Sequence, residues 1–127
     1  MQILITFLLL LYAMLSHAES CPDSPAMAAN ECLVNQLHNA EAILTKNYSA
    51  LHNAIPINEI NQAKKADALL TKSEEAWLTY RNTYCEYKGF IEGGAGSYKT
   101  MYEYQCLVQL TEQRAAELVT LRKYDYE

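Results

Sequence analysis

Glycine and proline are confined to three places in this 127-residue chain, and they divide it into three long segments. Pro22 and Pro25 precede the first segment, Pro56 ends it, and four glycines from Gly89 to Gly96 separate the second segment from the third. Proline disfavours helical geometry in the residue before it, and glycine is common where helices end. These residues therefore mark the boundaries of the regular elements.

Each segment repeats apolar residues at gaps of three and four, which is typical of one face of an amphipathic helix. The expected helices run from near Pro25 to Ile55, from Asn58 to Gly89, and onward from a cap at Ser97. Their expected inward-facing residues are Leu33, Leu37, Ala40, Leu44, Tyr48, Leu51 and Ile55, then Ala63, Ala66, Leu70, Trp77, Tyr80 and Tyr84, then Met101, Tyr104, Val108, Thr111, Ala115 and Leu118. Three helices joined by short connections predict an all-α, up-down-up bundle.

The amino terminus carries an almost unbroken apolar run over residues 3–15. At about 13 residues it is shorter than the roughly 20 that span a membrane, and it fits the apolar core of a secretory signal. Small residues at Ser16 and Ala18 follow, a spacing that suits a signal peptidase. We therefore expect cleavage to remove residues 1–18 and to leave one periplasmic or secreted domain, residues 19–127, without a membrane span. An uncleaved anchor and a lipid anchor on Cys21 are the less favoured alternatives.

Four cysteines follow the apolar run, at Cys21, Cys32, Cys85 and Cys106. An even count in a small exported domain predicts two disulfides, because a short chain buries too little surface to be stable without crosslinks. Bridges Cys21–Cys32 and Cys85–Cys106 would tie the amino-terminal arm to the first helix and the second helix to the third. Crossed pairings remain open. No two cysteines have the two-residue gap typical of zinc sites, so no metal is expected.

Charge and missing motifs exclude several functions. The formal net charge is −5, and nucleic-acid binding needs a basic stripe that the chain lacks. His38 and His52 would lie about 21 Å apart along a helix and cannot share a metal. Because the motifs of nucleophilic, phosphoryl-transfer and zinc-peptidase enzymes are missing, we expect no enzyme and no cofactor. The carboxylates expected on solvated helix faces without a partner are Glu74, Glu75, Glu86 and Glu92.

One pattern is more specific than the others. It comprises Trp77, Tyr80, Arg81, Cys85, Cys106, Arg114 and Leu118, with the glycine-rich stretch between the two cysteines. In these residues and spacings the chain resembles the LprI-type lysozyme-inhibitor domain, a family of exported bacterial proteins. A looser similarity precedes it, at Asn30, Cys32, Glu41 and Tyr48.

The chain departs from this pattern at Glu74, where the family commonly has Gln, and at Thr45, where it commonly has Asn. The resemblance implies a helical periplasmic or surface protein. It also implies inhibition of lysozyme, the activity attributed to the family's name-giver.

The same residues have a physical interpretation beside the resemblance. Trp77 is the only tryptophan and is expected as a core anchor, and Arg81 lies one turn beyond it. With Arg114 on the next helix, Arg81 is expected to satisfy carbonyls or carboxylates such as Glu117 at the bundle edge. The pattern therefore predicts structural pairing rather than an exposed recognition site.

Tyrosines cluster around the glycine-rich stretch, and tyrosine is common both at protein interfaces and at the solvent-exposed end of a small hydrophobic core. The candidate partner-binding residues are Glu92, Gly93, Gly94, Ser97, Tyr98 and Tyr102. The leading hypothesis is an envelope binding protein that inhibits lysozyme or a related wall-cutting muramidase by steric occlusion through this stretch. The alternative is a structural or assembly factor whose tyrosine patch binds another envelope protein.

Overall fold

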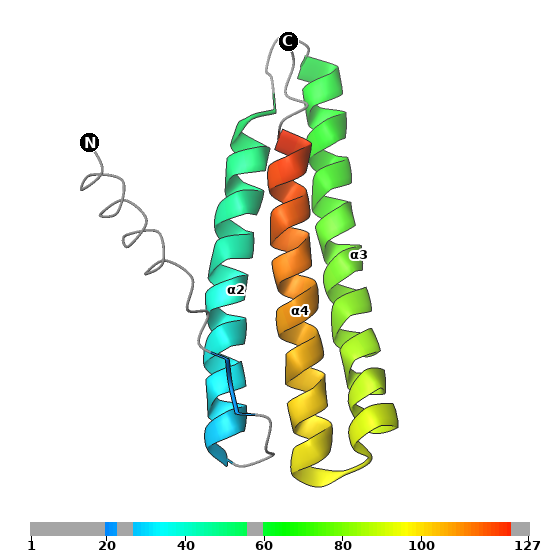
Figure 1. The fold of residues 1–127 in the computed structure, drawn as a ribbon. Coiled ribbons are helices and arrows are strands. Elements are labelled where there is room, and N and C mark those ends of the chain that lie inside the picture. Colours follow the sequence, from blue (N-terminus) through cyan, green and yellow to red (C-terminus); the bar gives the residue numbers. More distant parts are fainter. Residues whose placement is uncertain (1–19, 23–26, 56–59, 123–127) are drawn as a thin grey trace, which may run out of the picture.

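The computed structural model describes residues 20–22, 27–55 and 60–122 and consists there of three antiparallel helices (Figure 1). They are α2 (Met27–Asn53), α3 (Ile60–Gly93) and α4 (Gly96–Arg122). Helix α4 lies between the other two, because α2 and α3 each pack along it and make few contacts with each other. This arrangement confirms the predicted all-α, up-down-up bundle. The expected signal peptide, residues 1–18, lies outside the described part of the chain.

The core is centred on α2 and α4. Leu44, Leu51, Ala115 and Leu118 form a buried cluster, against which the half-buried Trp77 packs. These positions belong to the predicted inward-facing stripes of α2 and α4. None of the three described helices is long and apolar enough to span a membrane.

The predicted stripe of α3 is wrong at two positions. Tyr80 and Tyr84 are exposed, and the buried residues between Trp77 and Gly89 are Arg81 and Cys85. The face with Cys85 turns toward α4 because its disulfide partner lies there, and Arg81 occupies the same face one turn earlier. The tyrosines consequently point outward.

The structure contains both predicted disulfides. Cys21–Cys32 joins the arm to α2 with 5.7 Å between the Cα atoms, and Cys85–Cys106 joins α3 to α4 with 5.4 Å. The crossed pairings are therefore excluded. The second bridge fixes the lower halves of α3 and α4 in Figure 1 against each other.

Gly89 does not end its helix, contrary to the prediction. Helix α3 continues to Gly93, and a Cβ atom added at Gly89 would lie 2.9 Å from the carbonyl oxygen of Lys99. A Cβ atom at Gly93 would lie 2.5 Å from the backbone nitrogen of Lys99. These two glycines allow α4 to approach α3 closely, a role that sequence periodicity does not reveal.

The chain reverses at Gly94 and Gly96 instead. Their φ angles are +70° and +66°, a left-handed geometry that glycine adopts without the steric cost of a side chain. The amide of Gly94 donates to the carbonyl of Phe90 and closes the last turn of α3. Helix α4 begins at Gly96, so Ser97 lies inside its first turn and is not the cap that the sequence predicted.

Candidate functional site

Two groups of residues from the sequence pattern lie apart from each other in the bundle. The first is a charged cluster around Trp77, in the middle of α3. The second is the connection between α3 and α4, which we call the glycine turn and define as residues 92–97. The Cys85–Cys106 bridge lies between them along the chain.

Arg81 is the centre of the first group, with only 6% of its surface exposed. One terminal nitrogen donates to Glu41 on α2 at 3.0 Å and to Thr111 on α4 at 2.9 Å. Its Nε and its other terminal nitrogen donate to the side-chain oxygen of Asn82. A buried guanidinium needs such partners, because desolvation of an unpaired charge is costly. Arg81 thereby links all three helices.

Arg114 repeats this arrangement one layer further along the bundle. Its Nε donates to Glu74 at 2.6 Å, one terminal nitrogen donates to Glu117 at 2.7 Å, and the other donates to Ser73 at 3.0 Å. Burial lowers the pKa of Arg114, but the hydrogen bonds that it donates to Glu117 and Glu74 outweigh this effect, so the pKa lies above its usual value. Its charge is thus permanent at any physiological pH.

The two guanidinium groups also share a neighbour. The Cζ atoms of Arg81 and Arg114 lie 5.3 and 6.0 Å from the centre of the Trp77 ring, within cation–π range. The structural pairing predicted for both arginines, including Glu117, is what the geometry shows. The sequence analysis did not identify Glu41 as a partner of Arg81. It was wrong about Glu74, whose side chain is only 12% exposed and pairs with Arg114.

A groove of about 330 Å³ lies beside this cluster, where α2 and α3 separate. Its lining residues are Glu41, Leu44, Thr45, Tyr48, Glu74, Leu78 and Arg81. The charged groups in this lining all pair within the protein, so the groove presents no spare charge to a ligand. The cluster serves to hold the helices together.

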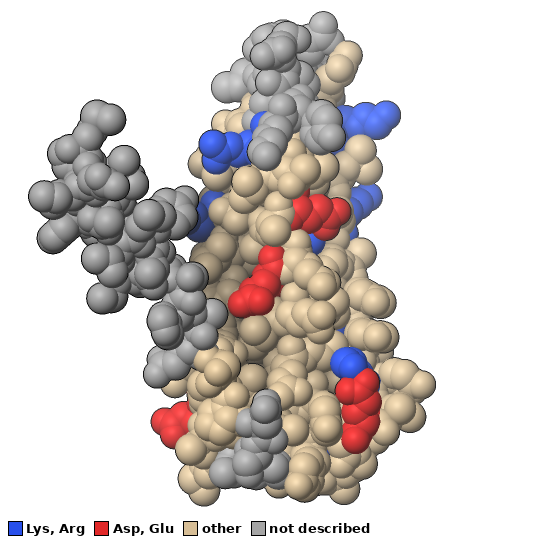
Figure 2. Space-filling view, viewed as in Figure 1, with Lys and Arg blue, Asp and Glu red and all other residues tan. Residues whose placement is uncertain are grey.

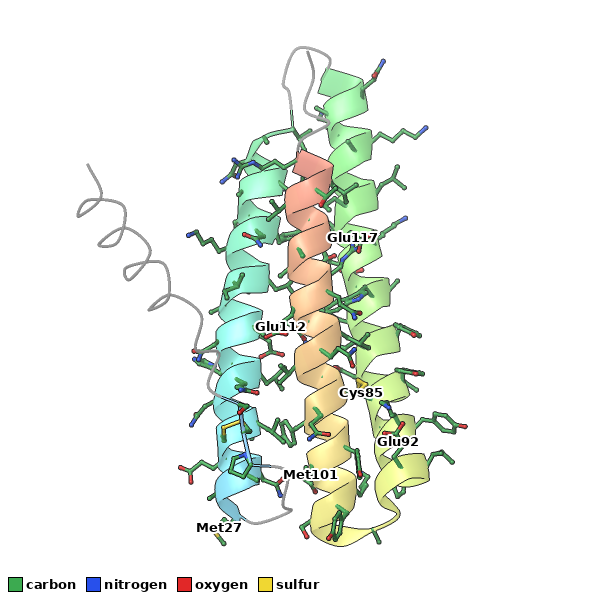
Figure 3. All side chains as sticks on the ribbon, in the orientation of Figure 1. Met27, Cys85, Glu92, Met101, Glu112 and Glu117 are labelled. Atoms are coloured by element: carbon green, nitrogen blue, oxygen red, sulfur yellow. A yellow bond between two sulfur atoms is a disulfide. The ribbon has the colours of Figure 1, made fainter. Side chains whose placement is uncertain are left out.

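The glycine turn forms the second group, at the end of the bundle where Figure 3 labels Glu92. Gly94, Ser97 and Tyr98 are exposed, and Tyr102 lies half-buried one turn further on α4. A Cβ atom at Gly94 or Gly96 would meet nothing within 4 Å, so the turn projects into solvent. The structure thus brings the six candidate partner-binding residues together at one end of the bundle.

The charges next to the turn form local pairs. Glu92, predicted to lack a partner, forms an ion pair with Lys88 one turn earlier on α3. Lys99 pairs with Glu103 at 2.8 Å and lies 4.5 Å from the centre of the Phe90 ring. On the face drawn in Figure 2 the acidic and basic side chains are scattered and form no basic stripe. The Lys88–Glu92 pair is exposed, and exposed pairs are weak, so a partner can displace it.

The fold and these two groups define a small helical-bundle protein, crosslinked by disulfides and bearing an exposed turn. Residues 20–118 match the family model described as "Lysozyme inhibitor LprI", so the chain belongs to the LprI family, a family of inhibitor domains. The resemblance drawn from the sequence is thereby confirmed. The disulfides and the family together indicate an extracytoplasmic protein.

A curated relative supports this membership. The chain is 36% identical over 101 residues to the uncharacterized protein R02472 of Rhizobium meliloti (strain 1021), which covers 75% of this chain and 72% of that protein. No solved structure matches the chain.

Proposed function

We propose that the protein is an exported inhibitor of lysozyme or of a related wall-cutting muramidase, which it occludes with the glycine turn. The family supports the class of partner. The single structural observation that carries the mechanism is a projecting turn held from both sides, by the Cys85–Cys106 bridge and by the close contacts of Gly89 and Gly93 with α4. A preorganised turn loses little conformational entropy when it enters a cleft.

The chemistry of the turn suits a polar cleft. Helix α4 starts at Gly96, and the first four amides of a helix have no partner within it, so this end offers backbone donors. Glu92 offers a carboxylate once Lys88 releases it, and Tyr98 offers a rigid ring with a polar tip. Donors, an acceptor and an aromatic surface therefore meet within a few residues.

The overall charge supports the same partner class. A formal net charge of −5 favours encounter with a basic enzyme and makes the association rate fall as salt is added. We further propose that removal of residues 1–18 releases the inhibitor into the periplasm or the medium, where its disulfides persist.

Replacing Ser97 with tryptophan is expected to weaken inhibition at least tenfold, because the bulky ring would occupy the space that the enzyme must enter. Ser97 is exposed in the first turn of α4, so the fold should tolerate the change. Thr120→Trp is the matched control, since Thr120 is exposed on the same helix at the opposite end of the bundle. Inhibition constants from cell-wall turbidity assays, with circular dichroism to check folding, give the comparison. Equal inhibition by the wild type and Ser97→Trp would exclude the turn as the contact.

The alternative, an assembly factor that binds another envelope protein, gains support from one observation. Tyr80, Tyr84 and Tyr87 are exposed on α3, away from the glycine turn. Loss of binding to an envelope protein after changes at these tyrosines, with no inhibition of any muramidase, would favour the alternative.

A further inference from the structure

The outer face of α3 carries a row of exposed apolar residues that the bundle does not use. Leu69, Tyr80, Tyr84, Tyr87 and Ile91 are between 40% and 67% exposed. With the small exposed residues Ser73 and Ala76 they follow one another at gaps of three and four, which places all seven on one side of the helix. We call these seven residues the α3 stripe.

The α3 stripe lies beside the face that packs on α4, and Ser73 belongs to both, because its hydroxyl accepts a hydrogen bond from Arg114 of α4. Trp77, Arg81 and Cys85 form that inner face, whereas Tyr80, Tyr84 and Tyr87 are exposed. Figure 3 shows side-chain rings projecting outward from the lower half of α3. No stripe position is charged, although α3 carries ten charged residues elsewhere. The rings of Tyr80 and Tyr84 already stack, with centroids 5.5 Å apart. An exposed row of uncharged residues that runs over more than six helical turns is typical of a surface that contacts another protein.

We infer that the α3 stripe binds the same stripe of a second copy, with the two α3 helices antiparallel and a two-fold axis at Tyr80. Such an interface must be self-complementary, because each residue on one copy meets the residue equally far from the axis on the other. The occupant of the face is therefore another molecule of this protein. This inference goes beyond the proposed inhibition and does not depend on it.

The order of residue sizes along the stripe favours an antiparallel pair. Counted from Tyr80, Ala76 and Tyr84 are equally distant, as are Ser73 and Tyr87. An antiparallel pair thus places each small residue opposite a tyrosine of the other copy, and Leu69 opposite Ile91. A parallel pair would set tyrosine against tyrosine and small against small, which leaves steric conflict at one end and voids at the other.

The flanking charges favour the same orientation. Lys72 and Glu86 lie on the same edge of the stripe on opposite sides of Tyr80. In the antiparallel pair Lys72 of one copy lies about 3 Å along the axis from Glu86 of the other, within reach of a lysine side chain. A parallel two-fold pair would put the two copies of this edge on opposite sides of the contact, so Lys72 and Glu86 could not meet.

The size of the stripe sets the strength of the contact. An aromatic side chain covers about 150–250 Å², so five half-exposed residues contribute on the order of 500 Å² per copy, less than the roughly 800 Å² of a standard interface. The dimer should therefore be weak and should dissociate on dilution to micromolar concentrations.

Sedimentation equilibrium of the exported, oxidised protein between about 10 µM and 1 mM tests the contact. We expect the dimer fraction of the wild type to rise across this range and Tyr80→Glu to raise the dissociation constant at least tenfold, because two carboxylates would face each other at the axis. Tyr98→Glu, at a tyrosine of similar exposure outside the stripe, is the matched control and should stay within twofold of wild type. A wild type that is monomeric at 1 mM, or equal dissociation constants for the two variants, would overturn the inference.

Engineered cysteines test the orientation. In the antiparallel pair the two copies of residue 80 meet at the axis, whereas the two copies of residue 87 lie about 21 Å apart along the helices. Tyr80→Cys should therefore form a covalent dimer under mild oxidation and Tyr87→Cys should not. Efficient crosslinking of Tyr87→Cys would contradict the antiparallel arrangement. Loss of inhibition by Tyr80→Glu without a change in self-association would assign the stripe to the muramidase instead.

Discussion

Replacing Arg114 with methionine is expected to lower the free energy of unfolding by about 3 kcal/mol, because the change leaves a buried carboxylate without its cation. The Arg114 and Glu74 side chains are only 9% and 12% exposed, so water cannot replace the interaction that the Glu74 carboxylate loses. Methionine keeps much of the aliphatic volume, so the loss reports on the charge rather than on packing. Urea denaturation followed by circular dichroism measures it.

Two controls separate this effect from other causes. Lys88→Met removes the cation of an exposed pair with Glu92, which should lower the free energy of unfolding far less than Arg114→Met does. Adding Glu74→Gln to Arg114→Met should restore much of the lost stability, because it removes the unpaired charge. If Arg114→Met and Lys88→Met have the same midpoint, the buried pair does not stabilise the bundle.

Removing the bridge between α3 and α4 by the double substitution Cys85→Ser and Cys106→Ser is expected to destabilise the protein by about 3 kcal/mol, the chain-entropy value for a closed loop of some 20 residues. Helicity at low temperature should persist, because the core of Leu44, Leu51 and Leu118 does not involve the bridge. Thermal melts followed by circular dichroism test both parts.

The other disulfide provides the comparison for this prediction. Cys21–Cys32 closes a shorter loop, with a sequence separation of 11, and ties only the amino-terminal arm to α2. Its removal should therefore lower the melting temperature less than removal of Cys85–Cys106. An unchanged melting temperature in the Cys85/Cys106 variant would show that this bridge is not a stabilising link.

Apolar periodicity predicted the helices and two of the three inner faces. It works on α2 and α4 because their buried positions, such as Leu44 and Leu118, are mostly apolar. On α3 a buried arginine interrupts the pattern, so the periodicity selected Tyr80 and Tyr84 in place of Arg81 and Cys85. Arg81 can be buried only because α2 and α4 supply Glu41 and Thr111, which lie far away in the sequence.

The sequence located the glycine-rich stretch from Gly89 to Gly96, but it did not reveal that these glycines have two different roles. Composition cannot distinguish Gly89 and Gly93, which let α4 approach, from Gly94 and Gly96, which take left-handed geometry. The Glu92 partner could have been found, since Lys88 precedes it by one helical turn. The inward position of Glu74 could also have been predicted, because Glu74 lies one turn before Trp77 on the same face of the helix.

The most direct test of the central claim is the rate at which a muramidase clears a cell-wall suspension in the presence of the oxidised protein. The account predicts slower clearing at micromolar excess, and weaker slowing as salt rises from about 50 to 500 mM, since charge steers the encounter. A folded, fully oxidised sample that leaves the clearing rate unchanged for several muramidases would contradict the inhibitor function.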